Sequence, residues 1–240
     1  MRIFHALTAL LLIPSSILLA QDNNGKNSED VTPPPIIKPS RDFVMLQFAY
    51  NNWYKKPDSV NTKPFGWAFN AYLCYDFPIK KTKLSFATGL GISSSIVYLN
   101  QQVLSLKDTG GTQVKFLPDT AFGEKYKRYK FATTYLTAPF ELRYYSNVIN
   151  RNKGFKAAVG LQIGTLLGAH TKGLTSVNGT NVKDKVDTKR YMSAWNFAAT
   201  GRVGWGNFSL FGSYNLTNVF KDNAGPPITP ISIGICLTGL

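Results

Sequence analysis

The chain has 240 residues, of which 27 are Lys or Arg and 13 are Asp or Glu, so its formal net charge at pH 7 is +14. A surplus of this size favours anionic partners, such as nucleic acid or an anionic lipid surface. Beyond residue 20, no stretch approaches the roughly 20 apolar residues of a membrane-spanning helix, so no such helix is expected in residues 21–240.

The first 20 residues have the pattern of a secretory signal peptide. An apolar run extends from Leu7 to Ile13, and the segment ends at Ala20 before a polar stretch. We therefore expect residues 1–20 to be a signal peptide, with an uncleaved helical anchor as the alternative. Export of the chain argues against nucleic acid as its partner.

Residues 21–40 are polar and end in a proline-rich run. Proline lacks the backbone N–H that a central strand needs for pairing. We therefore expect this segment to be an extended leader in the periplasm. The remaining residues, 41–240, are expected to form one domain.

Eight segments of this domain alternate between two kinds of side chain, as strands with two different faces do. In Leu84 to Ile96, bulky apolar residues alternate with serine, alanine and glycine. This pattern predicts a strand with an apolar outer face and an inner face of small side chains. The eight segments are Asp42–Tyr50, Phe65–Tyr75, Leu84–Ile96, Tyr129–Tyr145, Phe155–His170, Arg190–Val203, Asn207–Thr217 and Ile228–Leu237.

The connections between these segments alternate in length. Residues 51–64, 98–128 and 171–189 are long and polar, whereas the links at 78–83, 146–154 and 204–206 are short. Short periplasmic turns and longer extracellular loops are typical of an outer-membrane barrel. The sequence thus predicts an all-β, eight-stranded antiparallel up-and-down transmembrane β-barrel in the outer membrane of a Gram-negative bacterium.

Aromatic residues stand near the strand ends on the outward parity, where membrane interfaces are expected. The turn side has Tyr75, Tyr144, Phe155, Trp205 and Phe208, and the loop side has Trp67, Tyr98 and Tyr191. On the fifth strand, the expected inward residues are Lys156, Gly160, Gln162, Gly164 and Gly168.

Charged side chains on the inward parity predict a polar network inside the barrel. Its expected members are Glu141, Arg143, Lys156 and Arg202, with Gln162 and Asn196 above them. Charges in a narrow lumen must pair or stay hydrated, so an ion-pair plug is expected, with a gated conductance or proton path as the alternative. Cys74 and Cys236 fall on strands separated by another strand, which favours two buried thiols over a disulfide.

His170 is the one histidine after the signal segment, at the loop-side rim. Ser176, Asp184 and Asp187 follow it without a recognisable catalytic spacing, so we expect no enzyme, although a rim enzyme using His170 is an alternative. The two cysteines are too far apart to form a convincing metal site with this histidine, so we expect no metal site. We also expect no cofactor.

Basic clusters at Lys55–Lys56, Lys125–Lys130 and Lys183–Arg190 fall in the loops. Arginine and lysine side chains bind phosphate groups well. We therefore expect these clusters to contact outer-membrane lipid and the phosphates of lipopolysaccharide rather than nucleic acid. Asp58-Ser59-Val60 and Asp119-Thr120-Ala121 resemble short glycosylation sites of Bacteroidota.

Three stretches of the chain resemble one known family. The strand Tyr135 to Tyr144 is similar to the "Y-L-x-x-P-x-x-L-x-Y" strand of the PorT-like outer-membrane β-barrel family of Bacteroidota. Phe211 to Phe220 and Pro230 to Ile235 resemble its last two strands, and the resemblance covers about residues 42–240. It implies an outer-membrane eight-stranded barrel, and one lineage of the family serves type IX secretion.

These observations favour a non-enzymatic, monomeric barrel that has a filled lumen and presents basic extracellular loops for structural or interaction roles. Two alternatives are an accessory component of a secretion system, with envelope or secretion proteins as partners, and the small enzyme described above.

Overall fold

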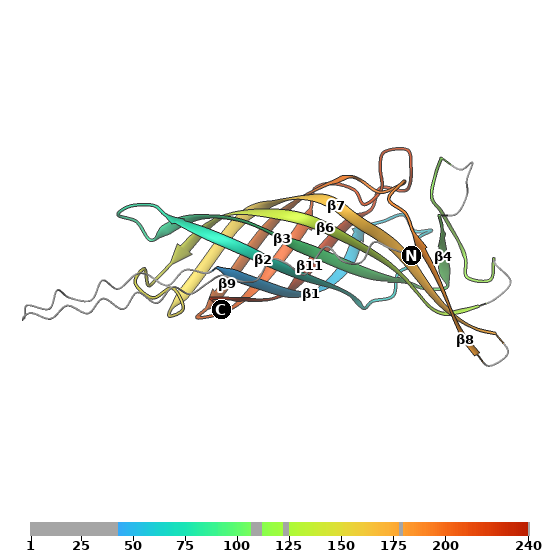
Figure 1. Ribbon diagram of the computed structural model, residues 1–240, viewed down its shortest axis with the longest axis horizontal. Coiled ribbons are helices and arrows are strands. Elements are labelled where there is room, and N and C mark those ends of the chain that lie inside the picture. The colour runs from blue at the N-terminus through green and yellow to red at the C-terminus, as the bar shows by residue number, and fades with distance from the viewer. Residues whose placement is uncertain (1–42, 107–111, 122–124, 178–179, 240) are drawn as a thin grey trace, which may run out of the picture. The chain divides into compact units, whose positions relative to one another are not determined.

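The computed structural model describes residues 43–106, 112–121, 125–177 and 180–239. The expected signal peptide and leader, residues 1–20 and 21–40, lie outside the described residues. The strands are β1 (Val44–Lys55), β2 (Gly66–Pro78), β3 (Leu84–Leu99), β4 (Gln102–Ser105), β5 (Lys115–Pro118), β6 (Tyr126–Tyr145), β7 (Phe155–Val177), β8 (Thr180–Asp187), β9 (Trp195–Trp205), β10 (Phe208–Asn215) and β11 (Thr229–Thr238) (Figure 1).

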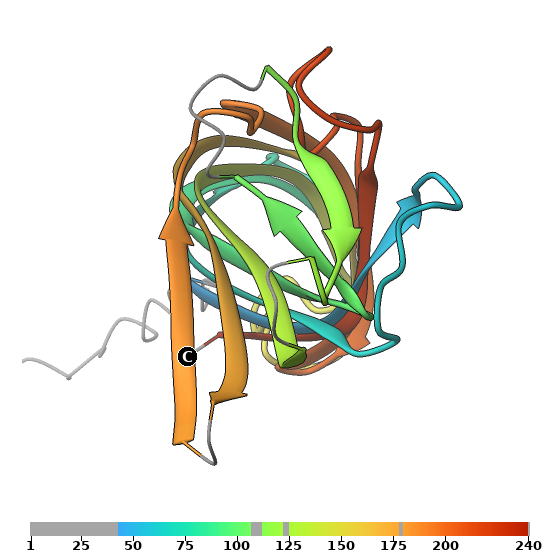
Figure 2. The same cartoon turned by 90° about the vertical axis from the view of Figure 1, so that its right-hand side faces the viewer.

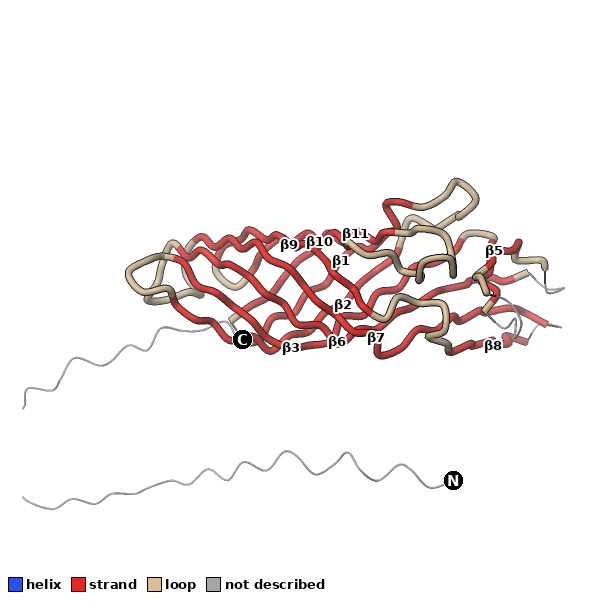
Figure 3. The backbone as a smooth tube through the Cα atoms, turned by 90° about the horizontal axis from the view of Figure 1, so that it is seen from above, coloured by secondary structure: helices blue, strands red, loops and turns tan. Residues whose placement is uncertain are grey.

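Eight of these strands form a closed antiparallel ring. They neighbour one another in the order β6, β3, β2, β1, β11, β10, β9 and β7, and β7 pairs back onto β6. Figure 3 shows these strands running obliquely side by side. A closed ring has no free sheet edge, which is what a bilayer requires of a spanning sheet. The predicted eight-stranded barrel is confirmed. Among the described residues, no helix is long and apolar enough to cross a membrane.

Two of the predicted loops contain strands of their own. Within 98–128, β4 and β5 form a separate two-stranded sheet, and within 171–189, β8 pairs with the far part of β7. The prediction that β7 ends at His170 was therefore wrong. We define the sheet extension as residues 126–131 of β6, 170–177 of β7 and 180–187 of β8 (Figure 2). Here β7 has passed its last pairing with β9 and pairs with β6 and β8 instead. Its strands can be polar because antiparallel sheets tolerate water on one face.

Large apolar side chains cover the outside of the ring. The five aromatic residues predicted for the turn side are all exposed there, as are Trp67 and Trp195 nearer the loops. Such an exterior suits the apolar band and aromatic girdles of a membrane barrel. Tyr191 does not belong to this exterior, because it lies buried inside the loop end of the barrel.

A β-bulge changes the facing of β7 near its middle. Thr134 pairs with Gly168, but Tyr135 pairs with Leu166, so one extra residue is accommodated. Beyond the bulge Ala169 is buried in the barrel interior and Gly168 faces outward, opposite to the predicted orientation of this glycine. Successive side chains of a strand point to opposite faces, so one extra residue exchanges the inward and outward positions that follow it.

The bare face of β3 makes room for bulky residues of both neighbouring strands. Tyr72 of β2 lies over Gly91 and its hydroxyl is 2.7 Å from Ser93 Oγ. On the other side, Ser85 and Ala87 pair with Arg143 and Glu141 of β6. Small residues on one strand thus match large ones on the next, as filling a narrow barrel requires.

A side chain at Gly91 should therefore disrupt this packing. A Cβ there would lie 2.6 Å from Tyr72 Cα and would also clash with the carbonyl oxygen of Ala71. We expect Gly91→Val to lower the free energy of unfolding by about 1–3 kcal/mol, the usual cost of overpacking. Gly201→Val is the control, because a Cβ at Gly201 meets nothing within 4 Å. Urea unfolding of the refolded barrel measures both; equal stabilities would contradict the prediction.

Candidate functional site

The turn end of the lumen contains a buried ion-pair network. Glu141 Oε2 accepts hydrogen bonds from Arg143 Nε at 2.7 Å and from Arg202 Nη2 at 3.1 Å. All three side chains are almost fully buried. The sequence predicted these three as inward residues, and the structure brings them together. Because the Glu141 carboxylate accepts hydrogen bonds from both guanidinium groups, all three side chains can remain ionised although they are buried.

Asp76 is a second buried carboxylate, which the sequence reasoning missed. Its Oδ1 lies 2.8 Å from Arg143 Nη1, and its Oδ2 accepts hydrogen bonds from Arg151 Nη1 at 2.5 Å and from the Tyr145 hydroxyl at 3.0 Å. The predicted second strand ended at Tyr75, whereas β2 continues to Pro78. Extending the alternation by one residue places Asp76 on the same inward face as Cys74.

The other predicted network residues have separate positions. Lys156 is buried at the turn end, where its Nζ donates to Thr238 Oγ1 at 2.7 Å. Gln162 and Asn196 instead line a cavity of about 60 Å³ in the middle of the lumen. The structure therefore divides the predicted set into a charged turn-end group and a polar group above it.

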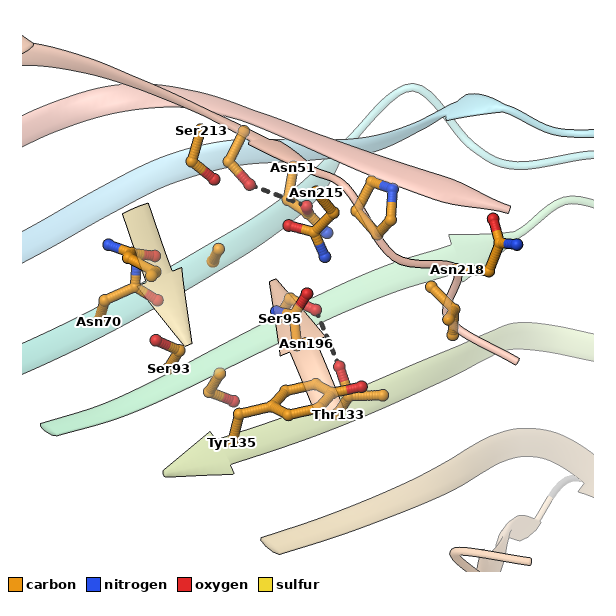
Figure 4. A pocket seen from close by; sticks show the side chains of 16 residues that line it. Asn51, Asn70, Ser93, Ser95, Thr133, Tyr135, Asn196, Ser213, Asn215 and Asn218 are labelled. Carbon is orange, nitrogen blue, oxygen red and sulfur yellow. Dashed lines mark hydrogen bonds between the residues drawn. The ribbon is translucent and has the colours of Figure 1, made fainter. Parts of the chain in front are cut away.

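The central cavity is lined almost entirely by amide and hydroxyl groups. Figure 4 shows Asn51, Asn70, Ser93 and Tyr135 around it, with Ser95 hydrogen-bonded to Thr133 at 3.1 Å. In the described part of the chain, Asn51 Nδ2 is buried without a hydrogen-bond partner. A cavity of this size and polarity can hold water, which would satisfy such a group.

Both cysteines lie in an apolar layer between the ion pairs and the cavity. Cys74 and Cys236 are buried as free thiols beside Met45, Tyr72 and Phe211. This agrees with the expectation of two buried thiols.

The loop end of the lumen is filled by apolar side chains from the strand ends and from several loops, which we call the mouth cluster. Its aromatic centre consists of Trp53, Phe116, Phe131 and Phe220, with ring centroids 6.0 to 6.3 Å apart in four contacting pairs. Around them are Val60, Val97, Leu99, Val103, Leu104, Leu106, Val114, Tyr129, Ala169, Tyr191, Met192, Val219, Ala224 and Ile228. β4 and β5 lie in front of the opening in Figure 2. The expected polar loops therefore bury an apolar core of their own.

His170 lies on the part of β7 beyond its last pairing with β9 and outside the closed ring. Burial, followed by the nearby Lys185 cation, lowers the pKa of its imidazole. Asp187 is its partner across the strands, but Ser176 is six positions further along β7, about 20 Å away. The structure does not bring His170 and Ser176 together.

Two of the three basic clusters meet in the sheet extension. Residues Lys125 to Lys130 and Lys183 to Arg190 are far apart in the sequence, but they flank the outer part of β7. Lys55 and Lys56 belong to a separate region, beside Tyr214 and Leu216.

A match to a protein family agrees with this architecture. Residues 43–221 match the family described as outer membrane protein beta-barrel domain. A crystal structure of Ail, the attachment invasion locus protein of Yersinia pestis, is similar with 12% identity and a TM-score of 0.32, over 81% of this chain and 95% of that chain. No curated protein matches the chain significantly. Because the family match covers well over half of the chain, this protein belongs to the outer membrane protein beta-barrel domain family.

Proposed function

We propose that this protein is a closed, non-enzymatic barrel that presents a basic sheet extension outside the cell for structural or interaction roles in the envelope. The observation that carries the proposal is the filling of the lumen. Along β1 alone, inward residues change from Met45 in the apolar layer, through Asn51 at the cavity, to Trp53 in the mouth cluster.

Each layer opposes the passage of solutes in its own way. The turn-end ion pairs occupy the space that eight strands leave, which is only wide enough for side chains. The mouth cluster is mainly apolar, so an ion that passes through it would lose most of its hydration without replacement. Between them lies the central cavity of about 60 Å³.

The position of His170 supports a role without catalysis. A nucleophilic mechanism needs a serine within hydrogen-bond reach of the base, and Ser176 is far from it. The outward orientation of the basic clusters instead supports recognition of an anionic surface.

We further propose that the barrel is an exported monomer of the PorT-like branch in Bacteroidota. The apolar run and Ala20 of the first segment support export, and the strand from Tyr135 to Tyr144 supports the lineage. The signal peptide would be removed, and residues 21–40 would remain as a periplasmic leader.

Affinity purification of the tagged full-length protein from crosslinked native membranes tests the proposed role. We expect lipid and other envelope proteins to be recovered, with cargo secretion unchanged when the gene is deleted. Recovery of secretion components together with loss of cargo export would overturn the structural role and favour the secretion accessory. Loss of a measurable enzymatic activity in a folded His170→Ala variant would overturn the absence of catalysis.

A further inference from the structure

Three lysines stand directly opposite one another on neighbouring strands of the sheet extension. Lys130 of β6 pairs with Lys172 of β7, and Lys172 pairs in turn with Lys185 of β8. Adjacent strands are about 4.8 Å apart, so the row spans only about 10 Å. Arg128 and Lys183 lie in the next row, on either side of Leu174.

These cations share one face of the sheet extension, the outward one. The alternate residues Tyr129 and Thr171 are buried, and Val186 packs against the mouth cluster. Because successive strand residues point to opposite faces, Lys130, Lys172 and Lys185 point away from the barrel interior.

Among the described residues, acidic side chains neutralise this face only in part. Asp187 forms an exposed ion pair with Lys185 at 3.0 Å, and Asp184 lies on the opposite face of β8, beside Val186. Like charges directly opposite on neighbouring strands are destabilising. A row of this kind therefore favours an anion that bridges the lysines.

The row lies at the level where the apolar exterior ends. Lys130 pairs on its other side with Tyr98 of β3, an aromatic of the type that marks a membrane interface. On β7, the exposed Leu167 is five residues before Lys172, about 16 Å along a tilted strand. Lysine side chains at the end of a membrane-facing surface extend their ammonium groups toward lipid headgroups.

We propose that Lys130, Lys172 and Lys185 form a binding site for the phosphate groups of a phosphorylated glycolipid in the outer leaflet, the chemistry of lipid A. The site adds a specific ligand to the proposed envelope role and does not depend on a closed lumen. Exposed ammonium groups bind phosphate as clustered point charges, and continuity with the lipid-facing exterior places a lipid phosphate beside them.

Native mass spectrometry of the full-length protein in zwitterionic detergent, titrated with diphosphoryl lipid A, tests this site. We expect the variant K130Q/K172Q/K185Q to bind roughly tenfold more weakly than the natural protein, as the loss of three exposed charge pairs implies. The control K80Q/K81Q/K83Q removes the same charge at the turn end, where these lysines are exposed, and should bind within about twofold of the natural protein.

A second measurement separates binding from folding. Without lipid, the triple variant should unfold at the same temperature as the natural protein or slightly higher, because repulsion between its lysines is removed. Lipid A should raise the unfolding temperature of the natural protein only. Equal binding by both variants, equal binding of dephosphorylated lipid A, or equal protection by inorganic phosphate or polyglutamate would overturn the proposal.

Discussion

Replacing Glu141 with glutamine is expected to lower the free energy of unfolding of the barrel by about 3–5 kcal/mol, the usual cost of breaking a buried ion pair. The reason is that Arg202 and Arg143 both depend on the same carboxylate oxygen, at 3.1 and 2.7 Å. Glutamine keeps the size and one acceptor oxygen but removes the negative charge. Arg143 would retain Asp76, whereas Arg202 would lose its ion pair within the narrow lumen.

Asp187→Asn provides the matched control for this change. It is also a carboxylate-to-amide substitution, but the Asp187–Lys185 pair is exposed and should contribute no more than about 1 kcal/mol. Urea titration of the refolded proteins, followed by the mobility difference between folded and unfolded barrels on gels, measures both variants. The same unfolding midpoint for Glu141→Gln and Asp187→Asn would refute the role given to the turn-end ion pairs.

Phe220→Ala is expected to loosen the mouth cluster, with a local cost of about 3–5 kcal/mol for the cavity left by a buried phenyl ring. Phe220 is 1% exposed and contacts the rings of Phe116 and Phe131. It thereby joins the connection before β11 to the β5 strand and to β6. Limited proteolysis of the refolded barrel should cut the loops faster in this variant.

Phe65→Ala serves as the control at the same end of the barrel. Phe65 is 79% exposed, so its removal leaves no cavity and should leave the cleavage rate unchanged. If the loops of Phe220→Ala are cut no faster than those of Phe65→Ala, the mouth cluster does not hold the loops together.

The membrane strands could be predicted because each carries its own two-residue period. Phe86 and Leu90 face lipid while Ser85 and Ala87 face the lumen, and this contrast is local in the sequence. The positions of Glu141 and Arg143 follow from the same parity. Asp76 was missed because the predicted strand ended one residue too early, not because its pattern differs.

The sheet extension and the mouth cluster could not be predicted in this way. β8 has two valines, Val182 and Val186, among polar and charged residues, a composition that also suits a solvated loop. It becomes a strand by pairing with β7. Val103, Met192 and Phe220 lie in three different loops and form one core only when the ring closes. Such non-local contacts leave little local signal in any one segment.

A recording of ionic current through the refolded full-length protein in a planar lipid bilayer tests the closed lumen most directly. The turn-end ion pairs, the apolar layer at Cys74 and Cys236, and the mouth cluster together predict no steady conductance above the background of the protein-free membrane. A large, steady current that appears in discrete steps as the protein inserts would contradict the closed lumen.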